Sequence, residues 1–462
     1  MIGLLGTGYI ADWHAQALRA VPGATLAAVC DKAPTRAHSF AKRYGVGRVY
    51  ESLEAMLEGP GLDAVHVLLP PEHHCRAAGA VVDSGRHVLL EKPMGTSPEE
   101  CAGLIDRAGR RGVQVGVGHN FLFSAAYERL RADLAAGRLG RADQVTITWN
   151  KGLDLLSSGP YDAWMLRAPE HIMLEIGPHC VAHMLDLVGP VENARVEATN
   201  PVDLPNGRRF YRRWQVDADR GTTRVTLLFS FAPGFAEHAI HVRGSLAGAT
   251  ADLERDTYTL HRHTRYGVDF DRYRMLVSEA RGLRGQARRN LARYALSKFK
   301  LSDEGQPYGA TFVRALRRFY AGLPGPPERR LSAELGRDVV ALCAEIGRRA
   351  RVPRDVPGFA LPEVADDPAR RPEVLVLGAP GFIGRELVRQ LLAGGRGPVR
   401  VLVRDAGRLP SDLRTRGVEV VIGDASRDGD LGRAMEGIAS VYHLARATTA
   451  KTWQEYYEQD VL

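Results

Sequence analysis

The stretch that decides the fold is IGLLGTGYIA, which occupies residues 2–11 at the start of the chain. Its apolar first half predicts a buried strand, and its two later glycines predict a tight turn into a helix. Glycine lets the backbone approach a pyrophosphate, whose negative charge the N-terminus of the helix then stabilises. We therefore expect a dinucleotide to contact this turn through Gly6, Gly8, Tyr9 and Ile10.

A second stretch of the same kind, VLVLGAPGFIG, occupies residues 374–384. It again predicts a strand, a glycine turn and a helix, so a second dinucleotide is expected at Gly378, Gly381, Phe382, Ile383 and Gly384. The residues that follow, 385–462, are too few for a complete cofactor-dependent catalytic unit. We expect one complete enzyme followed by an incomplete domain, and a deliberate short module is the alternative.

The composition is that of a soluble globular protein with two or three domains: 462 residues, 45% hydrophobic and 25% charged. No apolar run approaches the length of a membrane-spanning helix, and no signal peptide is visible. The five cysteines lack Cys-x-x-Cys spacing, which argues against a disulfide framework or a zinc site. We expect a cytoplasmic protein without a bound metal.

The formal net charge is +8, and most of the excess lies in one segment. Residues 271–300 hold seven arginines and two lysines against Asp271 and Glu279. A solvated helix explains this segment, but a basic amphipathic helix that contacts anionic lipid or a phosphorylated substrate is also open. Nucleic acid is not an expected partner, because no recognised binding motif accompanies the charge.

Strands and helices alternate over residues 1–121, which predicts an NAD(P)-binding Rossmann domain built on a doubly wound parallel sheet. The expected strands are 2–5, 25–30, 64–69, 87–90 and 114–117, and the clearest helices are 35–44 and 98–110.

Longer alternating runs follow over residues 122–352. They predict an α+β domain for substrate binding and dimerisation, with a mostly antiparallel, open-faced sheet and a basic helical insert at about 271–300. Its expected strands are 144–150, 191–198, 209–218, 222–232 and 237–243, and a helix is expected at 331–349.

Five prolines mark residues 353–372 as a linker. Residues 373–462 then predict an incomplete NAD(P)-binding domain, a partial second Rossmann unit with strands at 374–377, 399–403, 419–422 and 440–443.

The end of the second expected strand bears on the choice of cofactor. Asp31 lies about where an acidic residue reaches the ribose hydroxyls of NAD, with a turn or helix-cap role as the alternative. Lys32 and Arg36 follow closely and could hold a 2′-phosphate. NAD and NADP both stay open.

Four motifs lie at expected strand ends or on expected helices: Leu69-Pro70-Pro71 with His74, Glu91-Lys92-Pro93 after the fourth strand, Gly118-His119-Asn120-Phe121, and Glu175-Ile176-Gly177-Pro178-His179. In combination they resemble the glucose–fructose oxidoreductase, inositol dehydrogenase and MocA (Gfo/Idh/MocA) family of sugar oxidoreductases over residues 1–352. The resemblance implies that Leu69, Pro70, His74, Glu91 and Lys92 contact the cofactor.

The resemblance also implies a catalytic set of Lys92, Glu175 and His179. When a hydride leaves a secondary carbinol the hydroxyl proton must leave too, and histidine suits that transfer near neutral pH. A lysine at a strand end can stabilise the developing alkoxide. We expect His179 to be the general base and Lys92 to polarise the reacting oxygen. Glu175 is expected to orient the catalytic groups or to bind substrate. Because Glu175 and His179 are four residues apart, they are expected to share one helical face.

The candidate substrate ligands are Lys92, His119, Asn120, His171 and His183, and a purely structural role for His183 is equally open. The family usually has Asp where Glu175 stands, and its second acid, three residues after the histidine, is Ala182 here. These departures leave the reaction type in place but not the choice of sugar.

Residues 374–384, with Arg404-Asp405, Gly423-Asp424 and His443-Leu444-Ala445, resemble the N-terminal half of extended short-chain dehydrogenases of the NAD-dependent epimerase/dehydratase group. The resemblance implies that the glycines approach the pyrophosphate, that Asp424 faces the adenine, and that Arg404 favours a 2′-phosphate. That group's Tyr-x-x-x-Lys pair does not occur after residue 373, since Tyr456 and Tyr457 lack the lysine. We expect the second unit to be inactive.

These features predict NAD(P)-dependent hydride transfer between nicotinamide and a secondary hydroxyl of a sugar, cyclitol or nucleotide sugar. Fusion to an epimerase-like unit suggests a role in polysaccharide or sugar metabolism. The alternatives are a non-catalytic NAD(P)-binding sensor and a cofactor-recycling lyase or glycosidase of the same fold. A homo-oligomer is expected, because the open sheet face commonly pairs in the family.

Overall fold

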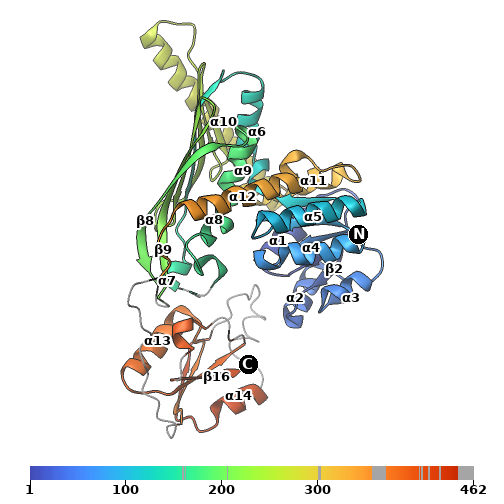
Figure 1. Ribbon diagram of the computed structural model, residues 1–462, viewed down its shortest axis with the longest axis vertical. Helices are drawn as coiled ribbons and strands as arrows, with labels where there is room; N and C mark the ends of the chain where they lie inside the picture. Colours follow the sequence, from blue (N-terminus) through green and yellow to red (C-terminus); the bar gives the residue numbers. More distant parts are fainter. Residues whose placement is uncertain are drawn as a thin grey trace. The chain divides into compact units, whose positions relative to one another are not determined.

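The computed structural model describes residues 1–158, 161, 163–204, 207–299, 303–355, 371–404, 406, 409–414, 417–425 and 428–445. Most of the predicted linker and the segment with Tyr456 and Tyr457 lie outside these residues. By their contacts the residues group into two compact units (Figure 1). Unit 1 comprises Met1–Gly152, Ile172–Thr199 and Arg212–Arg351, and unit 2 comprises Leu153–His171, Asn200–Tyr211 and Val352–Leu462.

The first sheet of unit 1 has six parallel strands in the order β3-β2-β1-β4-β5-β6, the doubly wound Rossmann arrangement that the sequence predicts. Its elements are β1 (Ile2–Leu5), α1 (Tyr9–Leu18), β2 (Leu26–Cys30), α2 (Pro34–Tyr44), β3 (Arg48–Tyr50), α3 (Leu53–Glu58), β4 (Ala64–Val67), α4 (His74–Asp83), β5 (His87–Glu91), α5 (Pro98–Arg111) and β6 (Val115–Gly118).

One strand of this sheet was not predicted. β3 has only three residues, all partly exposed, so it gives no alternating or apolar pattern. Because of β3, the strand that leads into Lys92 is the fifth of the sheet rather than the fourth. All four residues of β1 and of β4 are buried, which means that both faces of the sheet centre are covered.

The second sheet is mixed and has seven strands in the order β13-β12-β11-β7-β10-β9-β8. The pair β7–β10 is parallel, and the pairs β9–β10, β7–β11, β11–β12 and β12–β13 are antiparallel. Burial alternates along β10, so one face is covered and the other is open, as predicted. The strands are β7 (Ala142–Asn150), β8 (Glu192–Asp203), β9 (Arg209–Arg220), β10 (Thr223–Ser230), β11 (Glu237–Gly244), β12 (Gly248–Asp252) and β13 (Thr257–His261).

The helices of unit 1 outside the Rossmann fold are α6 (Ala125–Ala135), α8 (His171–Glu175), α9 (Gly177–Leu187), α10 (Val268–Lys298), α11 (Pro307–Gly322) and α12 (Ala333–Arg349). Two of them join the sheets: α12 contacts both α5 and α9, and α11 packs on α1. Trp13 of α1 stacks on Phe312 of α11 with ring centroids 6.3 Å apart. This packing fixes the end of β5 against the start of α9.

Unit 2 contains a four-stranded parallel sheet in the order β16-β15-β14-β17, the partial Rossmann sheet that the sequence predicts. Separate buried clusters around Val376 and Leu375 cover its two faces. The elements are β14 (Val374–Leu377), α13 (Phe382–Ala393), β15 (Val399–Val403), β16 (Val418–Ile422), α14 (Asp428–Met435) and β17 (Ser440–His443). Among the described residues of the chain, no helix has the length and apolarity to cross a membrane.

Replacing Gly6 by alanine tests the turn after β1. Gly6 has φ +97°, and an added Cβ would lie 2.6 Å from the carbonyl oxygen of Leu68. We expect Gly6→Ala to lower the free energy of unfolding by about 3 kcal/mol in chemical denaturation followed by circular dichroism.

The control is Gly8→Ala in the same turn, where φ is −74° and a Cβ meets no atom within 4 Å. Gly8→Ala should lower the free energy of unfolding by less than about 1 kcal/mol, the usual effect of alanine at a helix N-cap. Equal losses for the two variants would contradict this view of the turn.

Candidate active site

The carboxyl ends of the parallel strands in unit 1 carry most of the predicted site residues. Gly6 follows β1, Asp31 follows β2, Leu69 comes shortly after β4, Lys92 follows β5 and His119 follows β6. Ligands of open α/β sheets bind along this edge. The predicted residues, which are scattered in the sequence, therefore share one edge of the sheet.

The side chain of Lys92 contacts both the main chain and the side chain of Glu175. The Nζ of Lys92 donates to the backbone carbonyl of Glu175 at 2.9 Å and to its Oε1 at 3.0 Å. The two side chains keep 14% and 20% of their surface exposed, so the pair is mostly shielded from water. This double contact fixes the ammonium group of Lys92 relative to α8.

Glu175 and His179 do not lie on one continuous helix, contrary to the sequence prediction. α8 ends at Glu175, and α9 begins at Gly177. Pro178 has no N–H to continue the helical hydrogen bonds. The N–H of His179 donates to the carbonyl of Ile176 at 3.1 Å, so the Glu175 carbonyl is left for Lys92. The break thus creates the acceptor that positions the lysine.

The ring of His179 lies between two aromatic side chains. It stacks on Trp149 of β7 with centroids 4.9 Å apart and meets the edge of Phe121 at 5.0 Å. Its ring nitrogens make no hydrogen bond to any described residue. Burial, then the charge of Lys92, holds the pKa of His179 well below its usual range. The imidazole is therefore neutral near pH 7 and able to accept a proton.

Three further histidines surround His179: His119 after β6, His183 on α9 and His238 on β11. Both ring nitrogens of His119 and of His238 are buried without a hydrogen-bond partner among the described residues. Burial lowers the pKa of His119 to about 3 and that of His183 to about 4. Polar atoms left without partners in a buried site fit the binding of a polyhydroxylated ligand.

His238 was not predicted as a site residue. It lies on β11, where its ring meets Trp149 at 4.6 Å and Phe121 at 4.9 Å. Nothing in the sequence distinguishes it from other strand residues, because only the pairing of β11 with β7 brings it to α9. His183 instead has one partner, since its Nδ1 donates to the carbonyl of His179 at 2.6 Å.

Metal ligation finds no support in the described part of the chain. No group of three or more His, Cys, Asp or Glu side chains there has a metal-binding arrangement.

Asp31 holds the glycine turn in place. Its Oδ2 accepts from the N–H and the hydroxyl of Thr7 at 2.9 and 2.7 Å, and its Oδ1 accepts from Ala33 N–H at 2.9 Å. Burial alone would raise the pKa of Asp31, but these hydrogen bonds outweigh it and lower the pKa. Arg36 lies 3.9 Å from Oδ2 with 61% of its side chain exposed. The turn itself stays open, since Tyr9 is 74% exposed.

His74 joins the two loops at which cofactor contacts were expected. Its ring nitrogens contact the carbonyls of Leu69 at 2.6 Å and Pro93 at 2.7 Å, and the side chain is 1% exposed. Pro70, next to Leu69, is exposed at the loop surface. His74 therefore sets the spacing between the ends of β4 and β5.

Glu91 belongs to a buried chain of hydrogen bonds behind Lys92. Its Oε1 contacts Nε2 of His14 at 2.9 Å, the Nδ1 atoms of His14 and His66 are 2.8 Å apart, and His66 reaches the hydroxyl of Tyr320 at 2.6 Å. Oε2 of Glu91 accepts from the Lys92 N–H at 3.1 Å. The chain couples the backbone of Lys92 to α1 and α11.

Two other predicted substrate ligands have partners of their own. The amide of Asn120, 3% exposed, donates to the hydroxyl of Thr311 at 2.8 Å. His171 falls in unit 2, where its Nδ1 contacts the carbonyl of Trp164 at 2.8 Å and its ring stacks on that tryptophan.

The predicted cofactor residues of unit 2 form a second glycine turn. Gly378 has φ +84°, and a Cβ on Gly384 would lie 2.2 Å from the Gly378 carbonyl oxygen, so only glycine fits both positions. Gly381 caps α13, and Phe382 and Ile383 are 69% and 64% exposed beside it. Arg404 is exposed after β15, and the Asp424 N–H donates to Asp430.

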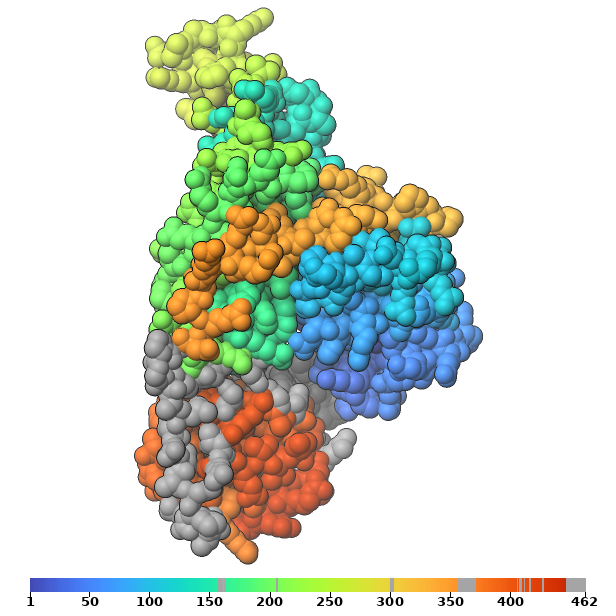
Figure 2. Space-filling view, viewed as in Figure 1, coloured from blue at the N-terminus to red at the C-terminus, as the bar shows by residue number. Residues whose placement is uncertain are grey.

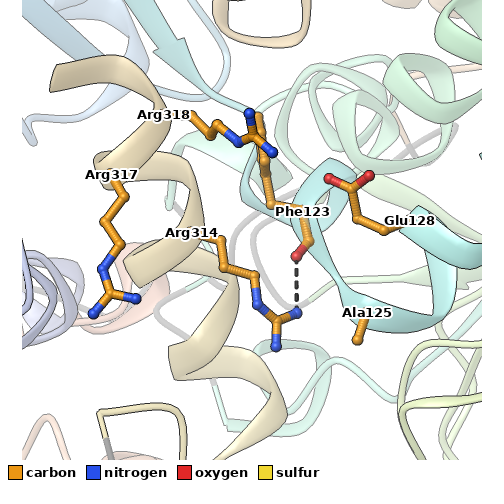
Figure 3. Close-up of a pocket in the computed structure, with 6 residues that line it drawn as sticks. All are labelled: Phe123, Ala125, Glu128, Arg314, Arg317 and Arg318. Carbon is orange, nitrogen blue, oxygen red and sulfur yellow. Dashed lines mark hydrogen bonds between the residues drawn. The ribbon is translucent and has the colours of Figure 1, made fainter. Parts of the chain in front are cut away.

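A hollow of about 350 Å³ lies elsewhere in unit 1, lined by Phe123, Ala125, Glu128, Arg314, Arg317 and Arg318 (Figure 3). Its arginines are occupied: Arg314 donates to the carbonyl of Phe123 at 3.2 Å and pairs with Glu304, and Arg318 lies 3.9 Å from Glu328. The neutralised charges give this hollow no role in the candidate chemistry.

Family models match both ends of the chain. The oxidoreductase family GFO_IDH_MocA, with its NAD-binding Rossmann fold, matches residues 1–119, and an NAD(P)H-binding model matches residues 378–458. Residues 1–119 are therefore similar to the NAD-binding domain of the Gfo/Idh/MocA family, and a second NAD(P)-binding domain follows near the C-terminus.

Curated relatives share part of this sequence. The 1,5-anhydro-D-fructose reductase of Ensifer adhaerens is 33% identical over 140 residues, 30% of this chain and 42% of that protein. The scyllo-inositol 2-dehydrogenase (NAD(+)) of Bacillus subtilis is 32% identical over 139 residues, 30% of this chain and 41% of that protein. The chain thus spans less than half the length of these two relatives.

Solved structures share the fold over a longer range. Levoglucosan dehydrogenase in complex with NADH and levoglucosan has a TM-score of 0.60 at 18% identity, covering 77% of this chain and 99% of that chain. The WlbA dehydrogenase of Bordetella pertussis, in complex with NADH and UDP-GlcNAcA, has a TM-score of 0.57 at 19% identity, covering 78% and 99%.

Replacing His238 by phenylalanine tests the buried histidines. Phenylalanine fits between the same aromatic rings and removes two buried nitrogens that have no partners among the described residues. We therefore expect the free energy of unfolding at pH 7 to rise by about 1–2 kcal/mol. The lowered pKa of His238 means that the unfolded chain takes up a proton below pH 6.5 that the folded chain does not. Stability should therefore fall less steeply from pH 6.5 to pH 5 in His238→Phe than in the wild type.

The control is His241→Phe on the same strand, where the side chain is exposed. It should leave the pH dependence of denaturant unfolding unchanged. A steeper loss of stability at low pH in His238→Phe than in the wild type would contradict the neutral state assigned to this ring.

Proposed function

We propose that the protein is an NAD(P)-dependent oxidoreductase that transfers a hydride between nicotinamide and a secondary hydroxyl of a sugar or cyclitol. One observation carries the proposal: the ammonium group of Lys92 is fixed by Glu175 within electrostatic range of the neutral ring of His179, which has no hydrogen-bond partner among the described residues. Named relatives that act on 1,5-anhydro-D-fructose and scyllo-inositol support the substrate class.

The residues around the first glycine turn fit a dinucleotide. A side chain at Gly6 would clash with a backbone carbonyl, Gly8 faces open space, and the N-terminus of α1 has no side-chain cap. These features leave room and unpaired N–H groups for a pyrophosphate. Asp31 would face the ribose, and Arg36 beside it could accept a 2′-phosphate. Bound nicotinamide would accept or donate the hydride.

The roles of the polar side chains follow from their contacts. In the oxidation direction, the unprotonated nitrogen of the neutral His179 ring takes the hydroxyl proton, because neither ring nitrogen has another partner among the described residues. Lys92 stabilises the negative charge that develops on the same oxygen, and Glu175 holds Lys92 in place. His119 and His238 supply buried ring nitrogens for neighbouring hydroxyls. In reduction His179 returns the proton.

A nucleotide sugar is the more specific substrate that we propose. A solved structure of the same fold carries UDP-GlcNAcA with NADH, and the second NAD(P)-binding domain resembles enzymes of the epimerase/dehydratase group. We infer a role in sugar or polysaccharide metabolism, with catalysis in the first unit alone.

The assay for this function is the absorbance of reduced nicotinamide with a panel of free sugars, cyclitols and nucleotide sugars, each with NAD and with NADP. A dehydrogenase accumulates reduced cofactor in proportion to product. A cofactor-recycling lyase or glycosidase converts substrate without accumulation, and a sensor binds NAD(P) without converting any member of the panel. Either of the last two results would replace the proposal.

The variants His179→Gln and Lys92→Met test the assigned roles. Loss of the base or of the fixed cation should lower kcat by about 10²–10⁴-fold, the usual contribution of a positioned acid–base or electrostatic group. His179 lies outside the glycine turn and is not among the expected cofactor contacts, so NAD binding measured by fluorescence titration should change little in His179→Gln. The control His241→Gln should keep full activity. Wild-type kcat in His179→Gln would refute the assignment.

The pH dependence of oxidation tests the charge state of His179. Because burial and Lys92 lower its pKa, the base form persists below pH 6.5 in the free enzyme. We expect the acidic limb of log(kcat/KM) against pH to have its midpoint below 6.5. A midpoint at or above 6.5 that vanishes in His179→Gln would show that the ring is not held neutral as described.

A further inference from the structure

The long helix α10 (Val268–Lys298) packs against the rest of unit 1 through polar side chains. Only Asp271 and Gln286 are buried along its length. Gln286 bonds to both the N–H and the carbonyl of Tyr258 at 2.8 Å, and Glu279 contacts Nδ1 of His261 at 2.9 Å. The inner face of this helix is therefore hydrophilic.

The opposite face of α10 is apolar and exposed. Its large apolar side chains recur at steps of three, seven or eight residues, the spacing of one helical face. Their exposed fractions lie between 41% and 69%, and Ala280 and Ala287 continue the row between them. We name this row the outer stripe: Tyr273, Leu276, Leu283, Leu291 and Tyr294.

Arginines line one side of the outer stripe. Arg281, Arg284 and Arg288 are exposed and make no ion pair or hydrogen bond to any described residue. The whole helix carries seven arginines and one lysine against three acidic residues. Figure 2 shows part of α10, in olive, at one end of unit 1.

This arrangement reverses that of an ordinary surface helix, which buries its apolar face and exposes its charges. A partner of this face must present apolar groups to the outer stripe. It must also present negative charge to Arg281, Arg284 and Arg288 beside the stripe. A second copy of the chain packed on the same face would add its own row of arginines to the interface, which is unfavourable. An anionic bilayer supplies both the apolar interior and the counter-charge.

We propose that α10 docks the protein on the surface of a membrane that contains anionic lipids. The outer stripe enters the boundary between headgroups and acyl chains, while Arg281, Arg284 and Arg288 contact lipid phosphates. α10 lies parallel to the surface and does not cross it, since no described helix is apolar and long enough to do so.

The test is cosedimentation of the full chain with vesicles of equimolar phosphatidylglycerol and phosphatidylcholine, compared with vesicles of phosphatidylcholine alone. We expect binding to the anionic vesicles only, weakening as salt is raised. Arg281→Glu/Arg284→Glu should lower the apparent affinity by about tenfold or more, given the contribution of each basic side chain near such a surface. Leu283→Ser/Leu291→Ser should lower it at unchanged net charge.

Matched controls separate the helix from the overall charge. Arg110→Glu/Arg111→Glu at the exposed end of α5 changes the net charge equally, and Leu246→Ser replaces a leucine that is 65% exposed outside α10. Both controls should bind as the wild type does, and circular dichroism should confirm that every variant is folded.

Three results would overturn the proposal. The first is equal binding to vesicles with and without phosphatidylglycerol. The second is an equal loss of binding in the α5 control and the α10 arginine variant. The third is an absence of vesicle binding together with a dimer in sedimentation velocity that Leu283→Ser/Leu291→Ser dissociates, which would assign the outer stripe to a second copy.

Discussion

The interaction on which the candidate site depends is the bond from Lys92 to the backbone carbonyl of Glu175. That carbonyl is available because helical hydrogen bonding stops at Pro178, and the His179 N–H turns back to Ile176 instead. In a continuous helix the same carbonyl would also accept from the His179 N–H, so Lys92 would share it. The break between α8 and α9 therefore helps to position Lys92, and it also begins the helix that carries His179. The packing of α12 on both α5 and α9 keeps these two parts in register.

The site places a charged lysine beside buried, neutral histidines. The charge of Lys92 lowers the pKa of His179 and of His119, and burial acts on both rings in the same direction. The result is one fixed positive charge among neutral imidazoles, which suits a reaction that takes up a proton while negative charge develops on oxygen. Glu91, His14 and His66 extend the network behind Lys92, so that its backbone is held as firmly as its side chain.

The glycine turns and buried strands could be predicted because their residues are constrained locally: Gly6 and Gly378 have positive φ values that other residues rarely adopt. β3 escaped prediction because three half-exposed residues carry no pattern. The prediction that Glu175 and His179 lie on one helix was wrong, although Gly177-Pro178 was a visible sign of a helix boundary. His238 could not be foreseen, because its place beside His183 depends on a strand pairing rather than on its own sequence. The reversed polarity of α10 likewise appears only once its partners are known.

The central proposal is hydride transfer in the first unit. The most direct test follows the hydride itself: a substrate deuterated at the reacting carbon is turned over with NAD(P), and the released nicotinamide is analysed by mass spectrometry. The account predicts one deuterium in the reduced cofactor for each product formed by the wild type. Product formation with an unlabelled, unreduced nicotinamide would contradict it.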